Sequence, residues 1–571
     1  MTRRQLLGVA LLALALLTWG RVMLVDRLAD QGYFGKYLLL AESLPKERLA
    51  EVSPAYLWLM VLLRGIGVHG IRTLQIIGVS LAALFAAIAA HRWAGPIAAV
   101  AAAVFILGSR AALVCATDLE PETLILLLDA IALAAMAHQR WFLAGLALGA
   151  SATARPVALL AAIAIGAWLL TRGLREVARF AIAVALPVML AVGANFLMTG
   201  EALLMDPGSV FYEGMNPTAT GYAGVQPRIV LDIEAAANQP DYMHVAYRIV
   251  ASRAERRPLD HKQANVWWTS KATAFMREYP LAALKLTMRK AVLALHSYDS
   301  WDLSTMQRKA ALLGRWPIWI PFALMPALAL IALFLRTRDA ALPLLFAAAG
   351  SVTLVAFYVT ARQRNAVLPA LAVAAAIGLT EIVSRRRALL AALVITLTVA
   401  FSINGRLQRE DMYGWNPAAG TEEQRAFDQA LELERRGQWA QADAILAELQ
   451  RRDYRPMRES RAVSSVAFHR VRAALHLPRD PRPQLAIAAR EAPGEVHVLA
   501  MQTFLSGRYR EADRRLRALH DPFSAGRALA DAWADLGDVQ RARKLADDVR
   551  SCIPEWRPVG GQAPSPVAPR P

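Results

Sequence analysis

The residues best placed for chemistry follow the first membrane-length apolar run. Asp26 and Asp30 come after about twenty apolar residues, and Tyr33, Lys36 and Tyr37 follow them directly. A carboxylate at a membrane edge can accept a proton from a hydroxyl or an amine, and aromatic and cationic neighbours can hold a polar substrate. An ordinary polar loop with interfacial tyrosines has the same composition, so this loop alone does not separate the two interpretations.

Most of the chain is apolar enough to lie in lipid. Its 571 residues are 56% hydrophobic and include repeated Ala, Leu, Val and Ile runs, which predicts a polytopic membrane protein. The formal net charge of +18 comes largely from short arginine clusters between apolar runs, a pattern that sets membrane topology and does not indicate nucleic-acid binding. Cys115 and Cys552 show no CxxC or Cys/His spacing, so neither a disulfide framework nor a zinc site is predicted.

The apolar runs predict an all-α membrane region of about eleven spans. The runs are Leu6 to Val25, Leu74 to Ala90, Ile97 to Leu113, Thr123 to Ala137, Trp141 to Ala152, Val157 to Leu170, Val177 to Leu197, Trp316 to Leu335, Leu342 to Tyr358, Val367 to Val383 and Ala388 to Ile403. The first run lacks a small-residue cleavage site, which favours a retained signal anchor. The fifth and sixth are short enough to form a re-entrant pair instead.

Basic clusters set the predicted orientation. Those on one face are Arg3/Arg4, His91/Arg92, His138/Arg140, Arg172/Arg175/Arg179, Arg336/Arg338 and Arg385/Arg386/Arg387. This face is therefore predicted to be cytoplasmic. Basic residues near the opposite face are Lys36, Lys46, Arg48, Arg64, Arg110, Arg155, Arg289, Lys290, Arg362 and Arg364. A phosphate carried on a lipid would explain them, because guanidinium groups bind phosphate oxygens bidentately, and snorkelling or pairing with an acid is the alternative.

Composition also predicts the domain order. Residues 1–403 form the membrane domain, with outer loops at 26–72 and 198–315; a linker covers 404–420, a soluble helical domain 421–556 and a disordered tail 557–571. In the first loop, the short apolar stretch Pro54 to Leu63 is predicted to lie in the membrane interface. In the second, Pro280 to His296 predicts an amphipathic surface helix. An odd number of spans places the C-terminal domain on the same outer side as these loops.

A repeated pattern marks the C-terminal domain. A glycine, a bulky residue two positions later and an alanine five positions later recur at Gly437/Trp439/Ala442, Gly507/Tyr509/Ala512 and Gly537/Val539/Ala542. The spacing leaves room for a degenerate copy around Pro483 to Pro493. The pattern resembles tetratricopeptide repeats, although helical hairpins of another type would also fit. Such an array offers a binding face, so contact with a protein partner or acceptor is expected there, and catalysis is not.

The order of motifs in the membrane domain is more specific than any one of them. It runs through the acidic first loop, Tyr37-x3-Ala41-x2-Leu44, Ser53-Pro54-Ala55-Tyr56, Glu120-Pro121-Glu122-Thr123-Leu124, Ala144-Gly145-Leu146-x-Leu148-Gly149, Arg155-Pro156, Tyr212-x-Gly214-Met215-Asn216-Pro217 and Phe357-Tyr358-x2-Ala361-Arg362-x-Arg364. Up to Arg155-Pro156 this order resembles the GT-C glycosyltransferases of the dolichyl-phosphate-mannose protein mannosyltransferase and aminoarabinose transferase type. The last two motifs resemble a bacterial branch of that superfamily that also carries C-terminal tetratricopeptide repeats. The resemblance implies a GT-C membrane fold, a polyprenyl-phosphate sugar donor and a first-loop carboxylate acting as base.

The resemblance also implies roles for single residues. Asp30 is the expected base, because it lies nearest Tyr33 and Tyr37, and Asp26 is its competitor. Gln31 stands where the family commonly has Glu, so the second carboxylate is sought at Asp118 or Glu120.

The remaining candidates bind substrate. Arg155, Arg362 and Arg364 are expected to bind the donor phosphate. Tyr212 and Asn216 are expected to shape a pocket for the acceptor or the donor sugar, and a purely structural turn fits them equally well. Tyr33, Lys36 and Tyr37 are expected to contact the substrate from the first loop. No essential metal or cofactor is predicted, although Asp118 and Glu120 could bind Mg²⁺ or Mn²⁺.

The expected activity is transfer of a sugar to an extracytoplasmic protein, lipid or polysaccharide acceptor, in the bacterial inner membrane. An oligosaccharide ligase or polymerase with a lipid-diphosphate donor is the nearest alternative, and a membrane scaffold is another. A transporter fits less well, because the two halves show no hydropathy repeat and Asp129 is the clearest acid within a span.

Overall fold

The computed structural model describes residues 37, 41, 53–199, 207–223, 230, 233, 243–313, 319–335, 338–384, 388–402, 420–452, 454, 465–491 and 495–552. Over these residues the fold is helical, with isolated bridge residues and no extended strand. The all-α prediction is therefore confirmed for the described part of the chain. The chain divides into two compact units, Met1–Met205 with Thr287–Leu407 and Asp206–Leu286 with Gln408–Pro571.

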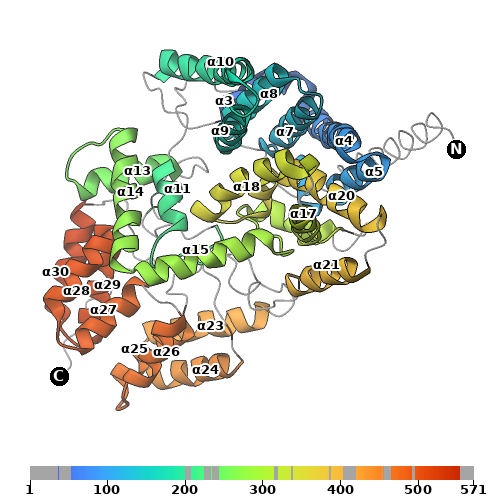
Figure 1. The fold of residues 1–571 in the computed structure, drawn as a ribbon. Coiled ribbons are helices and arrows are strands. Elements are labelled where there is room, and N and C mark those ends of the chain that lie inside the picture. Colours follow the sequence, from blue (N-terminus) through green and yellow to red (C-terminus); the bar gives the residue numbers. More distant parts are fainter. Residues whose placement is uncertain are drawn as a thin grey trace, which may run out of the picture. The chain divides into compact units, whose positions relative to one another are not determined.

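The first unit holds most of the apolar helices (Figure 1). Before the large outer loop these are α3 (Pro54–Leu63), η1 (Arg64–Ile66), α4 (Gly67–Ala94), α5 (Pro96–Leu107), α6 (Arg110–Ala116), α7 (Glu122–Ala137), α8 (Trp141–Ala154), α9 (Val157–Leu169) and α10 (Leu174–Thr199). After it come α16 (Ser304–Leu313), α17 (Leu324–Phe334), η2 (Arg338–Ala340), α18 (Ala341–Ala356), α19 (Ala361–Arg364), α20 (Leu368–Ser384) and α21 (Ala388–Ala400). Helix α15 (Pro280–Leu295) begins in the second unit and ends in the first.

Small residues bring the helices of the first unit close together. Gly145 and Gly149 on α8 face α10, where an added Cβ would lie 2.4 Å from the carbonyl oxygens of Phe180 and Val184 respectively. Only a residue without a side chain permits such an approach, and glycines four positions apart create it along one helix face. The glycines of the Ala144-to-Gly149 motif thus act in helix packing.

The lengths of the described helices support fewer membrane spans than the eleven that the apolar runs predict. Among the described helices, two are long and apolar enough to cross a membrane, Pro54–Ala94 and Leu174–Leu197, and the bent pair Pro96–Leu107 and Arg110–Ala116 could add a third. The other apolar helices are shorter, from 10 to 17 residues. About eleven spans are therefore not confirmed, and the predicted first span, Leu6 to Val25, lies outside the described residues.

The stretch Pro54 to Leu63, whose place in the membrane interface stays a prediction, is the start of a longer helical run. It forms α3, packs against α8 and continues through η1 into α4. Pro54, Tyr56, Leu57 and Met60 are buried. One face of α3 is thus buried in the first unit, while Leu62 near its end is 81% exposed.

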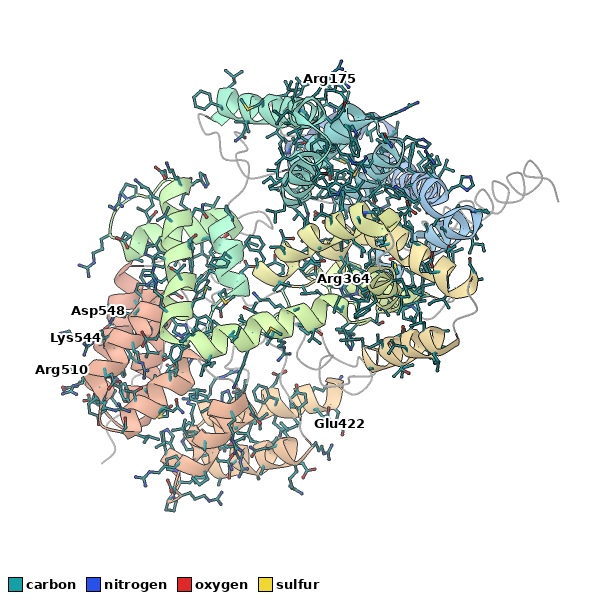
Figure 2. All side chains as sticks on the ribbon, in the orientation of Figure 1. Arg175, Arg364, Glu422, Arg510, Lys544 and Asp548 are labelled. Atoms are coloured by element: carbon teal, nitrogen blue, oxygen red, sulfur yellow. The ribbon has the colours of Figure 1, made fainter. Side chains whose placement is uncertain are left out.

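The second unit combines part of the large outer loop with the C-terminal helices. The loop supplies α11 (Pro207–Gly214), α13 (Met243–Ala254) and α14 (His261–Glu278). The C-terminal region supplies α23 (Gly420–Arg435), α24 (Trp439–Arg451), α25 (Val466–His476), α26 (Arg482–Glu491), α27 (Val496–Leu505), α28 (Tyr509–Leu519), α29 (Pro522–Asp535) and α30 (Val539–Cys552). Arg510, Lys544 and Asp548 mark α28 and α30 in Figure 2.

The outer loop and the C-terminal helices share a core. Trp268 and Phe275 of α14 cluster with Leu519 and Phe523, and the Lys271 Nζ atom donates a hydrogen bond to the carbonyl oxygen of Arg517 at 2.8 Å. The predicted outer loop 198–315 therefore divides between the units, which the change in composition near residue 404 did not indicate.

Glycine turns join the C-terminal hairpins at the predicted positions. Gly437, Gly507 and Gly537 separate paired helices and adopt positive φ angles of 72°, 76° and 87°. Such angles favour glycine, which explains why it recurs in the pattern. The interval Pro483 to Pro493, where a degenerate copy is expected, contains most of α26, and the type of repeat stays a prediction.

Candidate functional site

Three acids lie in and beside the short connection between α6 and α7. Asp118 and Glu120 belong to this connection, and Glu122 is the first residue of α7. All three are buried. Because a buried carboxylate is costly unless it is paired and hydrogen-bonded, their partners determine what this region can do.

Asp118 is held on both carboxylate oxygens. Lys309 Nζ lies 2.7 Å from its Oδ1, and the Thr305 hydroxyl donates to its Oδ2 at 3.0 Å. The Gln75 side-chain amide donates to its backbone carbonyl at 2.6 Å, and the Tyr56 hydroxyl donates to Gln75 Oε1. Burial lowers the pKa of Lys309, and the Asp118 charge opposes this effect. These bonds attach the acidic connection to α4 and α16.

Glu120 and Glu122 face two arginines from other helices. Arg362 Nη1 lies 3.3 Å from Glu120 Oε2 and 3.6 Å from Glu122 Oε1, and its Nη2 pairs with Asp302. Arg155, which follows α8, pairs with Glu122 through Nη2. The structure thus brings together three predicted site residues, Glu120, Arg155 and Arg362, that are far apart in the sequence.

Part of the hydrogen-bonding capacity of this cluster is unused. Within the described residues, the buried Nε of Arg362 and Oε2 of Glu122 have no hydrogen-bond partner. The side chains of Arg155 and Arg362 keep 18% and 14% of their surface exposed. Guanidinium N–H groups with spare capacity can bind an oxyanion, and a carboxylate oxygen without a partner can accept a proton.

The first loop reaches this region through Tyr37. Its ring is buried and packs edge-on against Tyr56, with ring centroids 4.9 Å apart. Burial raises the pKa of Tyr37, and the charge of Glu120 raises it further. The other first-loop candidates, Asp26, Asp30, Tyr33 and Lys36, lie outside the described residues.

Arg364 has a different environment from Arg362. Its Nη1 and Nη2 donate to the carbonyl oxygens of Tyr298 and Leu293 at 2.9 and 2.5 Å, and its guanidinium lies over the Phe322 ring. The residue is buried in the helical bundle of the first unit (Figure 2). Arg364 Nη1 also lies 3.8 Å from Asp299 Oδ1. Arg364 therefore fixes the segment that precedes α16, while Arg362 faces Glu120 and Asp302.

Tyr212 and Asn216 belong to the second unit. Tyr212 is buried against Trp268, with ring centroids 4.9 Å apart. The Asn216 side chain donates to the carbonyl oxygens of Tyr212 and Glu213 and accepts from Thr218 N. These contacts give both residues a structural use, in the core and in a turn.

Sequence reasoning did not select several residues of this cluster. Glu122 belongs to the Glu120-Pro121-Glu122 motif, and its position two residues after Glu120 was the available signal. Asp302 and Lys309 carry no local signal, because their partners lie far away along the chain.

No group of three or more His, Cys, Asp and Glu side chains that could hold a metal ion occurs in the described part of the chain. The possible Mg²⁺ or Mn²⁺ at Asp118 and Glu120 stays a prediction, and in the structure these acids pair with Lys309 and Arg362. Comparisons with models of known protein families, with curated proteins and with solved structures found no match to this chain.

Proposed function

We propose that this protein is a membrane glycosyltransferase that moves a sugar from a polyprenyl-phosphate donor to an extracytoplasmic acceptor. The observation that carries the proposal is the cluster in which Arg155 and Arg362, both partly exposed, lie against Glu120 and Glu122. The packing of Tyr37 against Tyr56 adds a first-loop residue to the same region. The motif order that resembles GT-C enzymes supports the same assignment.

The proposed reaction needs positive charge at the leaving group. Breaking the bond between the sugar and the lipid phosphate leaves negative charge on the phosphate oxygens, and cations placed there lower the barrier. Arg155 and Arg362 are the proposed ligands, because each can present guanidinium N–H groups in addition to those that bind carboxylates. Arg364 is proposed to position the α19 segment, since both its terminal nitrogens bind backbone carbonyls.

The reaction also needs a base for the acceptor hydroxyl or amine. Asp30 remains the proposed base, with Asp26 as its competitor, on the strength of their place in the first loop. Glu120 and Glu122 are better candidates for the second carboxylate than Asp118, because Lys309 and Thr305 occupy both oxygens of Asp118.

The proposed setting is the bacterial inner membrane, with the site and the C-terminal helices on the outer side. The long apolar helices support membrane insertion. The common core of α14 with Leu519 and Phe523 requires the outer loop and the C-terminal helices to share one side of the membrane. The C-terminal hairpins, proposed as tetratricopeptide-like repeats, would contact the acceptor or a protein partner.

The test measures transfer by vesicles that contain the purified full chain. Labelled polyprenyl-phosphate sugars and, in a separate arm, a lipid-diphosphate oligosaccharide serve as donors. We expect transfer from a monophosphate donor, loss of transfer in Asp30→Asn, and a loss of about 100-fold in Arg362→Gln. Arg179→Gln is the matched control, because Arg179 is exposed and, among the described residues, its ion pair is with Glu176 on its own helix.

Three outcomes would contradict the proposal or one of its residue roles. Transfer from the diphosphate donor alone would assign a ligase or polymerase, and the absence of transfer from every donor would remove the enzymatic interpretation. Full activity of Arg362→Gln would exclude Arg362 as a ligand of the leaving phosphate.

A further inference from the structure

Helix α15 (Pro280–Leu295) is one continuous helix (Figure 1). It exposes a stripe of large apolar side chains. The stripe consists of Leu281, Leu284, Met288, Val292 and Leu295, whose exposed fractions run from 37% to 73%. Spacings of three and four residues place all five within an arc of about 80° on the helix surface. Soluble surfaces rarely carry a contiguous apolar patch of this kind without a partner.

The opposite face of α15 is already occupied. Leu286 and Leu293 are buried there, and Lys290 is fully buried. The Lys290 Nζ atom donates to the carbonyl oxygens of Ala356 and Phe357, at the end of α18, at 3.0 and 2.9 Å. The helix therefore has two apolar faces, and the exposed stripe is the one that the protein does not cover within its described residues.

The exposed stripe resembles the surface of a candidate membrane span. On α10, which is long and apolar enough to cross a bilayer, Leu186, Met189 and Leu190 are exposed to between 59% and 66%. Helix α15 is unsuited to crossing, because its 16 residues include Lys285, Arg289 and Lys290. At 1.5 Å per residue it is about 24 Å long, shorter than a hydrocarbon core of about 30 Å.

We propose that α15 lies along the extracytoplasmic surface of the membrane that holds this chain. The apolar stripe is inserted among the lipid acyl chains. A helix with one face in lipid and charged residues at its edge binds in the interfacial plane. Lys285 is exposed beside the stripe and is placed to meet lipid phosphates. The occupant of the stripe is thus the bilayer that surrounds the apolar helices of the same chain.

This arrangement also sets the depth of the candidate site. The carbonyl oxygen of Leu293, at the end of α15, accepts the Arg364 hydrogen bond, and Arg364 shares α19 with Arg362. A stripe held in the acyl chains therefore keeps Arg362 close to the level of the lipid headgroups. The inference does not depend on which reaction the site performs.

The test is the solvent accessibility of nitroxide labels in phosphatidylethanolamine and phosphatidylglycerol vesicles. In a full-length background with Cys115→Ala and Cys552→Ser, single cysteines replace Leu284, Met288 or Val292 for labelling. Leu190→Cys on α10 is the lipid control, and Lys544→Cys on the exposed face of α30 is the water control. Collisions with oxygen report lipid, and collisions with a water-soluble nickel chelate report water.

We expect the oxygen-to-nickel ratio at the three stripe positions to match Leu190→Cys and to exceed Lys544→Cys by about threefold or more. High nickel access would place the stripe in water, and low access to both reagents would place it against protein; either result overturns the proposal. Photo-crosslinking of the unsubstituted chain by lipids with an acyl-chain diazirine gives a second measurement. Absence of adducts on α15, when α10 is labelled, would also refute it.

Discussion

Replacing Lys309 by methionine should destabilise the first unit and disturb its acidic connection. Lys309 is fully buried, and its ammonium donates to Asp118 Oδ1 at 2.7 Å and to the Thr117 carbonyl at 3.0 Å. Without this partner, the buried Asp118 carboxylate keeps the Thr305 hydroxyl as its side-chain donor. Breaking a buried pair in this way costs about 3–5 kcal/mol.

The other changes at this pair should cost less. Thr305→Val removes one hydrogen bond to a charged oxygen, worth about 1.5–3 kcal/mol. Lys309→Met combined with Asp118→Leu removes both charges and should recover most of the loss, because apolar side chains of similar volume can replace a buried pair at little cost. The double-mutant cycle should therefore show a coupling of at least about 2 kcal/mol.

The assay is the midpoint of detergent-induced unfolding, followed by tryptophan fluorescence in bicelles. It compares the parent chain with Thr305→Val, Lys309→Met, Asp118→Leu and the combination of the last two. Transfer activity, where the donor is found, should fall in Lys309→Met, because the connection that carries Glu120 is no longer fixed. A midpoint for Lys309→Met equal to that of the parent would refute the reasoning. So would a double variant whose loss equals the sum of the two single losses.

Two further predictions concern helix packing and pH. Gly149→Ala should destabilise the contact of α8 with α10 by about 1–3 kcal/mol, because its Cβ would overlap a backbone carbonyl, whereas Gly166→Ala, with open space around it, should match the parent in the same unfolding assay. Burial alone would lower the pKa of His497, but Glu495 and Asp531 outweigh this effect and raise it to about 9. A raised histidine pKa stabilises the fold fully below its unfolded value of about 6.5, so stability should decrease by on the order of 2–3 kcal/mol between about pH 6.5 and 9. His497→Gln should lose this decrease in thermal unfolding, and an unchanged pH profile would contradict the assignment.

Local features of the fold could be predicted from the sequence. Apolar runs located most helices of the first unit, because burial and helix periodicity act over a few residues. Gly437, Gly507 and Gly537 located the C-terminal turns, because positive φ angles select glycine. The number of spans could not be read in the same way, since hydropathy marks an apolar run but not the length of the helix that it forms.

Contacts between distant segments could not be predicted from one sequence. Lys309 pairs with an acid 191 positions away, and Arg362 reaches Glu120 across 242 positions. Neither pair leaves a local pattern. The amphipathic pattern of α15 predicts a surface helix but does not say which side of the helix is exposed. Lys290 carries a charge and is therefore expected on the exposed side. In the structure it is buried and donates hydrogen bonds to the carbonyl oxygens at the end of α18.

The different environments of Arg362 and Arg364 follow from their spacing. Residues two apart on a helix point about 160° away from each other, so the two arginines leave α19 on opposite sides. In the structure one guanidinium faces the carboxylates of Glu120 and Asp302, and the other binds the carbonyls of Leu293 and Tyr298. An Arg-x-Arg motif at a membrane edge is therefore better interpreted as one ligand and one positioning residue than as a paired phosphate clamp. The same geometry explains why Arg155, from the end of α8, is the second cation of the cluster instead of Arg364.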